Sequence, residues 1–107
     1  MIFSTDIKNR VLKDLALLIS ENKSEIITQN KIDLDSAGNI DPTLIDRLKV
    51  DERKVDGMVS AVEEIISDED PQGKVLHEYA HPNGMLVQNK VVPFGNILII
   101  YESRPDV

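Results

Sequence analysis

Apolar residues recur at helical spacing through the first two thirds of the chain. After the capping residues Ser4-Thr5-Asp6, a stripe of aliphatic side chains falls on one helical face. Its members are Ile7, Val11, Leu15, Leu18 and Ile19. Ser24 can cap a renewed turn, so the pattern predicts either one kinked helix or two between positions 5 and 34. Gly38 then marks a helix stop or a loop.

Two further helices are predicted after this turn-rich stretch. Asp41-Pro42 combines an N-cap residue with proline at the first helical position, which predicts a short helix through Leu48. Asp51 predicts the cap of a longer helix, which has the clearest apolar periodicity of the chain. Its apolar positions are Val55, Met58, Val59, Val62, Ile65 and Ile66. Gly57 inside this helix costs about 1 kcal/mol relative to alanine, so we expect it to mark a close packing contact. We expect the acidic run 68–70 to be a solvated turn.

The pattern becomes extended after Pro71-Gln72-Gly73. Two extended runs flank His81-Pro82-Asn83-Gly84, and Asn-Gly between such runs predicts a β-hairpin because both residues tolerate a positive φ. Residues 96–101 form an unbroken, β-branched apolar run, which is typical of a parallel strand buried on both faces. Such a strand needs neighbours and a crossover connection. Either it pairs with the hairpin in a small fold, or the chain is a piece of a larger one. We favour the larger fold.

The composition of the chain argues against several classes of function. Twelve lysines and arginines against 19 aspartates and glutamates give a net charge of −7, which argues against binding nucleic acid or an anionic membrane. The chain has no cysteine, so disulfides, thiolate metal sites and cysteine nucleophiles are excluded within it. Its N-terminus has no signal-peptide pattern, and its longest apolar run is far too short to cross a bilayer. We expect a soluble cytoplasmic protein.

Most candidate sites fail on their spacing. The glycines fit neither nucleotide-phosphate loop. Residues 33–38 resemble the start of a calcium loop, but Leu44 stands where a bidentate glutamate is needed. His77 and His81 lie on a predicted strand and turn, where this spacing does not bring both rings to one face. The serines have no histidine base at a recognisable spacing. We therefore predict no metal site and no catalytic residue in this chain.

One segment carries candidate chemistry. Glu102-Ser103-Arg104-Pro105 directly follows the predicted buried strand, and ligands of open α/β sheets bind beyond the carboxyl ends of the strands. Arg104 could bind a phosphate or a carboxylate through two parallel hydrogen bonds. The alternative is a surface arginine in a turn that proline ends.

The same segment resembles a known family. Residues 92–105, and Tyr101-Glu102-Ser103-Arg104-Pro105 above all, are similar to the start of the cofactor domain of the gamma-glutamyl phosphate reductases. These enzymes are also called glutamate-5-semialdehyde dehydrogenases and form part of the aldehyde dehydrogenase superfamily. Upstream segments resemble the family in the same order, namely Asn30–Leu34, Leu44–Leu48, the run through Val55–Met58, Pro71–Gly73 and His81–Gly84. The resemblance extends from about residue 7 to residue 107. It covers only the N-terminal portion of the family, whose members are several times longer.

The resemblance implies an α/β fold in three parts. Positions 1–70 would be an N-terminal helical segment, and positions 71–93 a β-hairpin of the kind that serves in oligomerisation. Positions 94–107 would be the first strand and loop of an incomplete, Rossmann-like cofactor domain. We expect the isolated chain to be marginally stable or self-associated, since an apolar strand edge invites pairing with another chain.

The resemblance also implies the chemistry. The family uses NADPH to reduce gamma-glutamyl phosphate to glutamate-5-semialdehyde in proline biosynthesis, and it relies on a cysteine thiolate. Because this chain has no cysteine, we expect it to be inactive alone. By resemblance, Glu102, Ser103, Arg104 and Pro105 line the cofactor and substrate cleft, and Arg104 is the anion contact. Asp106 stands where the family has asparagine.

A non-enzymatic function is the alternative. In the superfamily the hairpin contributes to subunit contacts, and the polar positions of residues 74–92 suit an exposed element. The chain would then act as a helical and hairpin module that makes homo-oligomers.

Overall fold

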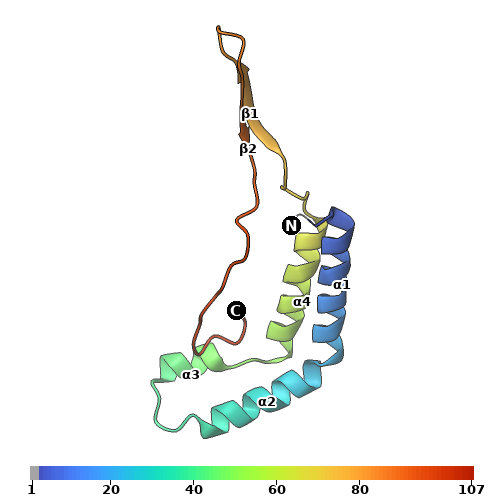
Figure 1. Ribbon diagram of the computed structural model, residues 1–107. Coiled ribbons are helices and arrows are strands. Elements are labelled where there is room, and N and C mark those ends of the chain that lie inside the picture. Colours follow the sequence, from blue (N-terminus) through green and yellow to red (C-terminus); the bar gives the residue numbers. More distant parts are fainter. Residues whose placement is uncertain (1–2) are drawn as a thin grey trace.

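Four helices and one two-stranded hairpin follow each other in a computed structural model that describes residues 3–107 (Figure 1). Helices α1 (Thr5–Glu21) and α2 (Lys23–Ser36) meet at Asn22, where the backbone leaves helical geometry at φ −99° and ψ 13°. The Asn22 side-chain amide donates to the Leu18 carbonyl at 2.8 Å, so it satisfies a carbonyl at the end of α1. The first apolar stretch is thus two helices, and the break falls at Asn22.

Three predicted N-caps are confirmed, whereas Ser24 is not a cap, because α2 begins at Lys23 and places Ser24 inside the helix. Ser4 accepts a hydrogen bond from the Ile7 amide at the start of α1. Asp41 does the same for the Thr43 amide in α3 (Pro42–Leu48). Asp51 accepts from the Lys54 amide in α4 (Glu52–Ser67). Each cap satisfies an amide that has no partner within its helix, and contributes about 1 kcal/mol.

Helices α1 and α4 lie side by side (Figure 1). Ala16 of α1 and Val55 of α4 are buried, and Val50 completes the small core. The aliphatic stripe that the sequence places on one face of α1 is largely exposed, with Ile7, Val11, Leu15 and Leu18 all open to solvent. Periodicity identifies residues that share a face, but it does not say which face a neighbouring helix covers.

The expected packing contact at Gly57 is absent. A Cβ atom built on this residue would meet nothing within 4 Å. Because Gly57 lies in the interior of α4 with ordinary helical geometry, the position has room for a larger residue.

The predicted hairpin is confirmed, although its turn differs from the expected one. Strands β1 (Val75–Ala80) and β2 (Leu86–Lys90) pair antiparallel, with Tyr79 opposite Val87. The Gly84 amide donates to the His81 carbonyl at 2.9 Å, and the His81 amide donates to the Met85 carbonyl at 2.7 Å. Of the two residues expected to need a positive φ, only Gly84 has one, at +94°. This is a three-residue loop ended by a left-handed glycine, rather than a two-residue turn.

The molecule is elongated, and the hairpin stands away from the helices as an arm (Figure 1). We call residues 74–91 the arm. The principal extents are 68 × 30 × 23 Å and the radius of gyration is 20.3 Å, where a compact chain of this length has about 13 Å. The accessible surface is 8959 Å², where a compact protein of 12.0 kDa exposes about 6000 Å². Much apolar surface therefore has no cover within the described part of the chain.

The expected strand at residues 96–101 is not formed. The structure has no strand in residues 91–107, and the segment runs from the arm back towards α3 without a neighbouring strand (Figure 1). Its apolar side chains are exposed, including Phe94 at 95%, Leu98 at 84% and Ile100 at 88%. A strand exists only where a second strand supplies hydrogen-bond partners, and the described residues offer none here. None of the helices described in residues 3–107 is long and apolar enough to span a membrane.

Candidate functional site

The loop predicted to bind a ligand returns to the junction of α3 and α4 (Figure 1). Arg104 and Asp106 line an open hollow of about 320 Å³. Its other walls are Asp46 and Arg47 of α3 and Lys54 of α4. We call these five residues the charged hollow.

The remaining predicted site residues lie apart from it. Pro105 lines a neighbouring hollow with Val50 and Met58, while Glu102 and Ser103 line neither one. Ser103 has a φ of +54°, which is uncommon for a residue other than glycine. The Val107 amide donates to the Arg104 carbonyl at 3.1 Å and closes a turn. The structure thus brings Arg104 towards other charges and leaves Glu102 and Ser103 outside.

The charged hollow is locally positive. Its three cations and two carboxylates leave a formal charge of +1 in a chain whose net charge is −7. Among the ion pairs within 4 Å in residues 3–107, none includes any of these five side chains. Lys54 Nζ donates to the Lys49 carbonyl at 2.5 Å. The guanidinium groups of Arg47 and Arg104 make no described hydrogen bond, and a guanidinium fork matches phosphate or carboxylate geometry. The arrangement suits an anion.

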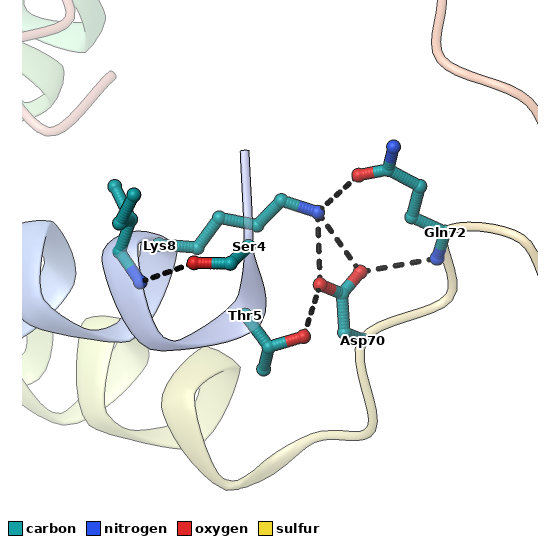
Figure 2. Close-up of polar contacts among 6 residues, drawn as sticks. Ser4, Thr5, Lys8, Asp70 and Gln72 are labelled. Carbon is teal, nitrogen blue, oxygen red and sulfur yellow. Dashed lines mark hydrogen bonds and ion pairs between the residues drawn. The ribbon is translucent and has the colours of Figure 1, made fainter. Parts of the chain in front are cut away.

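A second polar cluster joins α1 to the segment that enters the arm. Figure 2 shows the Lys8 ammonium between Asp70 and Gln72, with Thr5 on the far side of the Asp70 carboxylate. Lys8 Nζ lies 2.8 Å and 3.1 Å from the two Asp70 oxygens. Thr5 Oγ1 donates to the Asp70 carboxylate at 2.8 Å, and the Gln72 backbone amide donates to the same carboxylate at 3.0 Å.

These donors lower the pKa of Asp70 to about 2. The hydrogen bond from Lys8 contributes most, followed by those from the Gln72 amide and the Thr5 hydroxyl. Asp70 therefore does not lie in a solvated turn, as its acidic neighbours suggested, since its side chain is only 17% exposed. No sequence pattern reports this cluster, because Lys8 and Asp70 are 62 positions apart and meet only where the start of α1 lies beside the end of α4. Its contacts position the arm and leave no open carboxylate for chemistry.

Asn30 is the other polar residue that the structure makes important. It is the one buried polar side chain among the described residues. Its amide donates to the Leu48 carbonyl at 2.7 Å, and its carbonyl accepts from the Val50 amide at 2.8 Å. Asn30 begins one of the segments that carry the family resemblance. Its contacts hold α2 against the link between α3 and α4, which is a structural function.

The two histidines serve the hairpin. His81 Nδ1 accepts from the Asn83 amide at 3.2 Å, and the His77 ring lies 5.9 Å from that of Tyr79. Across residues 3–107 no group of three histidine, aspartate or glutamate side chains gathers closely enough to hold a metal ion.

The chain was compared with known proteins in sequence and in structure. No family model matches the chain. The chain is 40% identical over 106 residues to the gamma-glutamyl phosphate reductase of Thermodesulfovibrio yellowstonii, and 43% identical over 105 residues to that of Erythrobacter litoralis. Each match covers 97% of this chain. The chain resembles gamma-glutamyl phosphate reductase.

A solved structure supports the same resemblance. The gamma-glutamyl phosphate reductase of Thermotoga maritima superposes with a TM-score of 0.68 and 30% identity, over 80% of this chain and 21% of that one. The chain spans about a quarter of the length of the curated relatives that it matches. The likeness in sequence and in fold therefore concerns one part of the reductase.

Proposed function

We propose that this chain forms the N-terminal part of a gamma-glutamyl phosphate reductase. The observation that carries the proposal is the identity of about 40% to reductases over 97% of the chain. Residues 1–70 would supply the helical segment, 71–93 the hairpin, and 94–107 the first strand and loop of a Rossmann-like cofactor domain. A biosynthetic enzyme of this kind works in the cytoplasm, and we propose that compartment here.

The reaction we propose for the whole enzyme is the reduction of gamma-glutamyl phosphate to glutamate-5-semialdehyde and phosphate, a step of proline biosynthesis. NADPH would supply the hydride. None of the 107 residues is a cysteine, so the thiolate that attacks the acyl carbon would come from another part of the enzyme. The contribution of this chain would be binding, through the loop Glu102–Pro105. The charged hollow fits this task, because Arg47, Lys54 and Arg104 offer donors that suit a phosphate group.

The exposed C-terminal segment supports the same proposal. Residues 96–101 are apolar and β-branched, yet they have neither strand partners nor cover. In a sheet flanked by helices these side chains would be buried on both faces. We propose that this segment pairs as a strand once the remaining strands of the cofactor domain are present.

We propose a subunit contact as a second function, and the exposure of the arm favours it. All side chains of β1 and nearly all of β2 are open to solvent. An isolated two-stranded hairpin is marginally stable in water and gains from packing against another surface. A second copy of the enzyme would provide that surface.

A growth experiment tests the first proposal. The stretch of the Thermodesulfovibrio yellowstonii reductase that matches this chain would be replaced by this chain. The resulting chimera would be expressed in a bacterium that lacks its own reductase and therefore requires proline. We expect growth without added proline. A chimera that is folded and abundant, yet supports no growth, would contradict the proposal.

A further inference from the structure

We propose that Asn83 is a site of spontaneous covalent modification, at which asparagine converts to aspartate and isoaspartate through attack by the backbone nitrogen of Gly84. Both residues lie in the loop at the tip of the arm, between β1 and β2. The inference concerns the chemistry of this chain alone, and it does not depend on the proposed function.

The reaction is a ring closure followed by hydrolysis. The Gly84 nitrogen forms a bond to the side-chain carbonyl carbon of Asn83 and loses its proton. The bond from that carbon to the side-chain nitrogen breaks, and ammonia leaves with the proton. Water then opens the cyclic imide. Opening at the backbone carbonyl carbon leaves isoaspartate, and opening at the side-chain carbonyl carbon leaves aspartate. Either product adds one negative charge to a chain whose net charge is −7.

The residue that follows Asn83 sets it apart from the other asparagines. Asn83 is followed by glycine, whereas the other six asparagines are followed by arginine, lysine or isoleucine. A side chain on the following residue crowds the attacking nitrogen. Glycine has no Cβ atom and allows a close approach of its backbone, so the ring closes most easily at Asn83.

The tip of the arm is exposed and is held only by local contacts. Residues 81–85 are all exposed, and Figure 1 shows this loop at the end of the arm, away from the helices. Within the described residues 3–107, the hydrogen bonds of the loop join its own members. One of them occupies the attacking group, because the Gly84 amide donates to the His81 carbonyl at 2.9 Å. This bond must open first, and at the end of an exposed hairpin such opening costs little free energy.

The Asn83 side chain is already turned along the backbone. Its Oδ1 accepts a hydrogen bond from the Met85 amide at 3.0 Å, two positions further on. The side-chain carbonyl therefore lies over the Gly84 peptide instead of extending into solvent. The Met85 amide also polarises this carbonyl, since negative charge develops on Oδ1 as the nitrogen attacks.

A second acidic or amide residue before a glycine shows what the fold can prevent. Asp56 precedes Gly57 and can form the same cyclic imide in principle. It lies in the interior of α4, however, and its carboxylate pairs with Lys23 at 2.7 Å. Helical hydrogen bonds hold the Gly57 nitrogen in place. We therefore expect isoaspartate at the arm and not in α4.

Isoaspartate changes the length of the loop. Its backbone runs through the former side-chain carbon, so the chain between His81 and Met85 gains one carbon atom. The loop is closed by the His81 amide, which donates to the Met85 carbonyl at 2.7 Å, and by the Gly84 amide on the His81 carbonyl. A longer loop does not keep both bonds. We expect the tip to fray, with faster amide exchange in β1 and β2.

Peptide mapping of the 107-residue chain over time is the test. The purified chain is kept at pH 8, and trypsin then releases residues 75–90, which carry Asn83 and Asn89 in one peptide. Mass spectrometry detects the replacement of the side-chain NH2 by OH and assigns it to one asparagine. Chromatography separates the aspartate and isoaspartate forms. We expect Asn83 to convert at least about tenfold faster than Asn89. Its rate should lie within about tenfold of the rate in urea, where the loop bonds are lost.

Two glycine variants separate the chemistry from the mobility of the loop. Gly84→Ala places a Cβ atom beside the attacking nitrogen and strains a residue with a φ of +94°. It should loosen the loop and yet slow the conversion of Asn83 at least about tenfold. Gly95→Ala is the matched control, because Gly95 also has a positive φ, +90°, but lies outside the arm. It should leave the rate at Asn83 unchanged.

Three results would overturn the inference. Asn83 that stays intact in the folded chain, while it converts in urea, would show that the loop protects the Gly84 amide. Equal conversion at Asn83 and Asn89 would remove the special place of the glycine. An undiminished rate in Gly84→Ala would show that the Gly84 nitrogen is not the attacking group. Anion exchange separates the converted chain by its added charge, and unchanged amide exchange in its β1 and β2 would contradict the frayed tip.

Discussion

Lys8 and Asp70 lie 62 positions apart in the sequence, and their side chains meet at 2.8 Å. Lys8 is on the first turns of α1, and Asp70 is on the segment that leaves α4 for the arm. Thr5 and Gln72 complete the contact (Figure 2). The pair therefore fixes the base of the arm to the helices, and it sets the direction in which the arm stands.

The contact should make stability depend on pH in the acid range. The pKa of Asp70 falls from 3.8 to about 2 in the folded chain, so the folded state favours the ionised form. The stabilisation is fully present above the unfolded pKa, and it is lost as the pH falls from about 4 to about 2. Asp70→Asn should lower the urea midpoint of unfolding at pH 7, and the difference from the original chain should vanish near pH 2.

Glu69→Gln is the control for this prediction. Glu69 pairs with Lys74 at 2.9 Å, but both side chains are well exposed, and such surface pairs contribute little. Its midpoint should stay close to that of the original chain at every pH. A midpoint difference for Asp70→Asn that remained constant between pH 7 and pH 2 would contradict the argument.

Asn30→Ala should be strongly destabilising. The change leaves the Leu48 carbonyl and the Val50 amide without their partner, and Asn30 itself is buried. Each unsatisfied buried group costs on the order of 1–3 kcal/mol, so we expect a loss of about 3 kcal/mol in the free energy of unfolding. Asn30→Asp keeps the acceptor for Val50 but puts a buried carboxylate oxygen against the Leu48 carbonyl, so it should be destabilising as well. Thr28→Ala on the same helix removes an exposed hydroxyl and should stay within about 0.5 kcal/mol. Equal losses in the alanine variants at 28 and 30 would refute the bridging function of Asn30.

Two glycines should respond in opposite directions to alanine. Gly57 has helical geometry and free space around its Cα, so Gly57→Ala should raise the free energy of unfolding by about 0.5–1 kcal/mol. Gly84 has a φ of +94° at the tip of the arm, where a side chain is strained by about 1–2 kcal/mol. Gly84→Ala should lower the stability of the hairpin, seen as faster amide exchange in β1 and β2. A loss of stability in Gly57→Ala would contradict this prediction and would support the close packing contact that the sequence suggested.

Association through the arm should depend on concentration. Sedimentation velocity of the chain should show species larger than the 12.0 kDa monomer, with a share that grows with concentration. Leu86→Lys places a charge on the exposed apolar surface of β2 and should restore the monomer. Asn89→Lys adds the same charge to a polar position of the same strand and should not. If Leu98→Lys dissolved the association and Leu86→Lys did not, the C-terminal segment, and not the arm, would be the contact.

Short sequence patterns were sufficient to predict the elements whose formation depends on residues close together in the chain. The three helix caps and the hairpin follow from residues close together in the sequence, and the structure confirms them. The buried face of α1 and the absence of a strand at 96–101 depend on what covers each segment, and no local pattern contains that information. The Lys8–Asp70 pair is missed for the same reason.

The candidate site shows the same division. Arg104 was predicted from its place after an apolar run and from the family resemblance. Arg47 and Lys54 join it only because α3 and α4 meet where the C-terminal loop returns. Spacing along the chain cannot report this arrangement, since two of its walls lie half the sequence away from the third.

Kinetics of the purified chimera test the central claim most directly. The Thermodesulfovibrio yellowstonii reductase carrying this chain in place of its matching stretch would be given glutamate-5-semialdehyde, phosphate and NADP, and the formation of NADPH would be followed by absorbance. We predict phosphate-dependent activity that Arg104→Met reduces at least about tenfold and Arg53→Met leaves unchanged. A folded chimera without activity, or one in which both variants behave alike, would contradict the claim that this chain forms a ligand-binding part of the reductase.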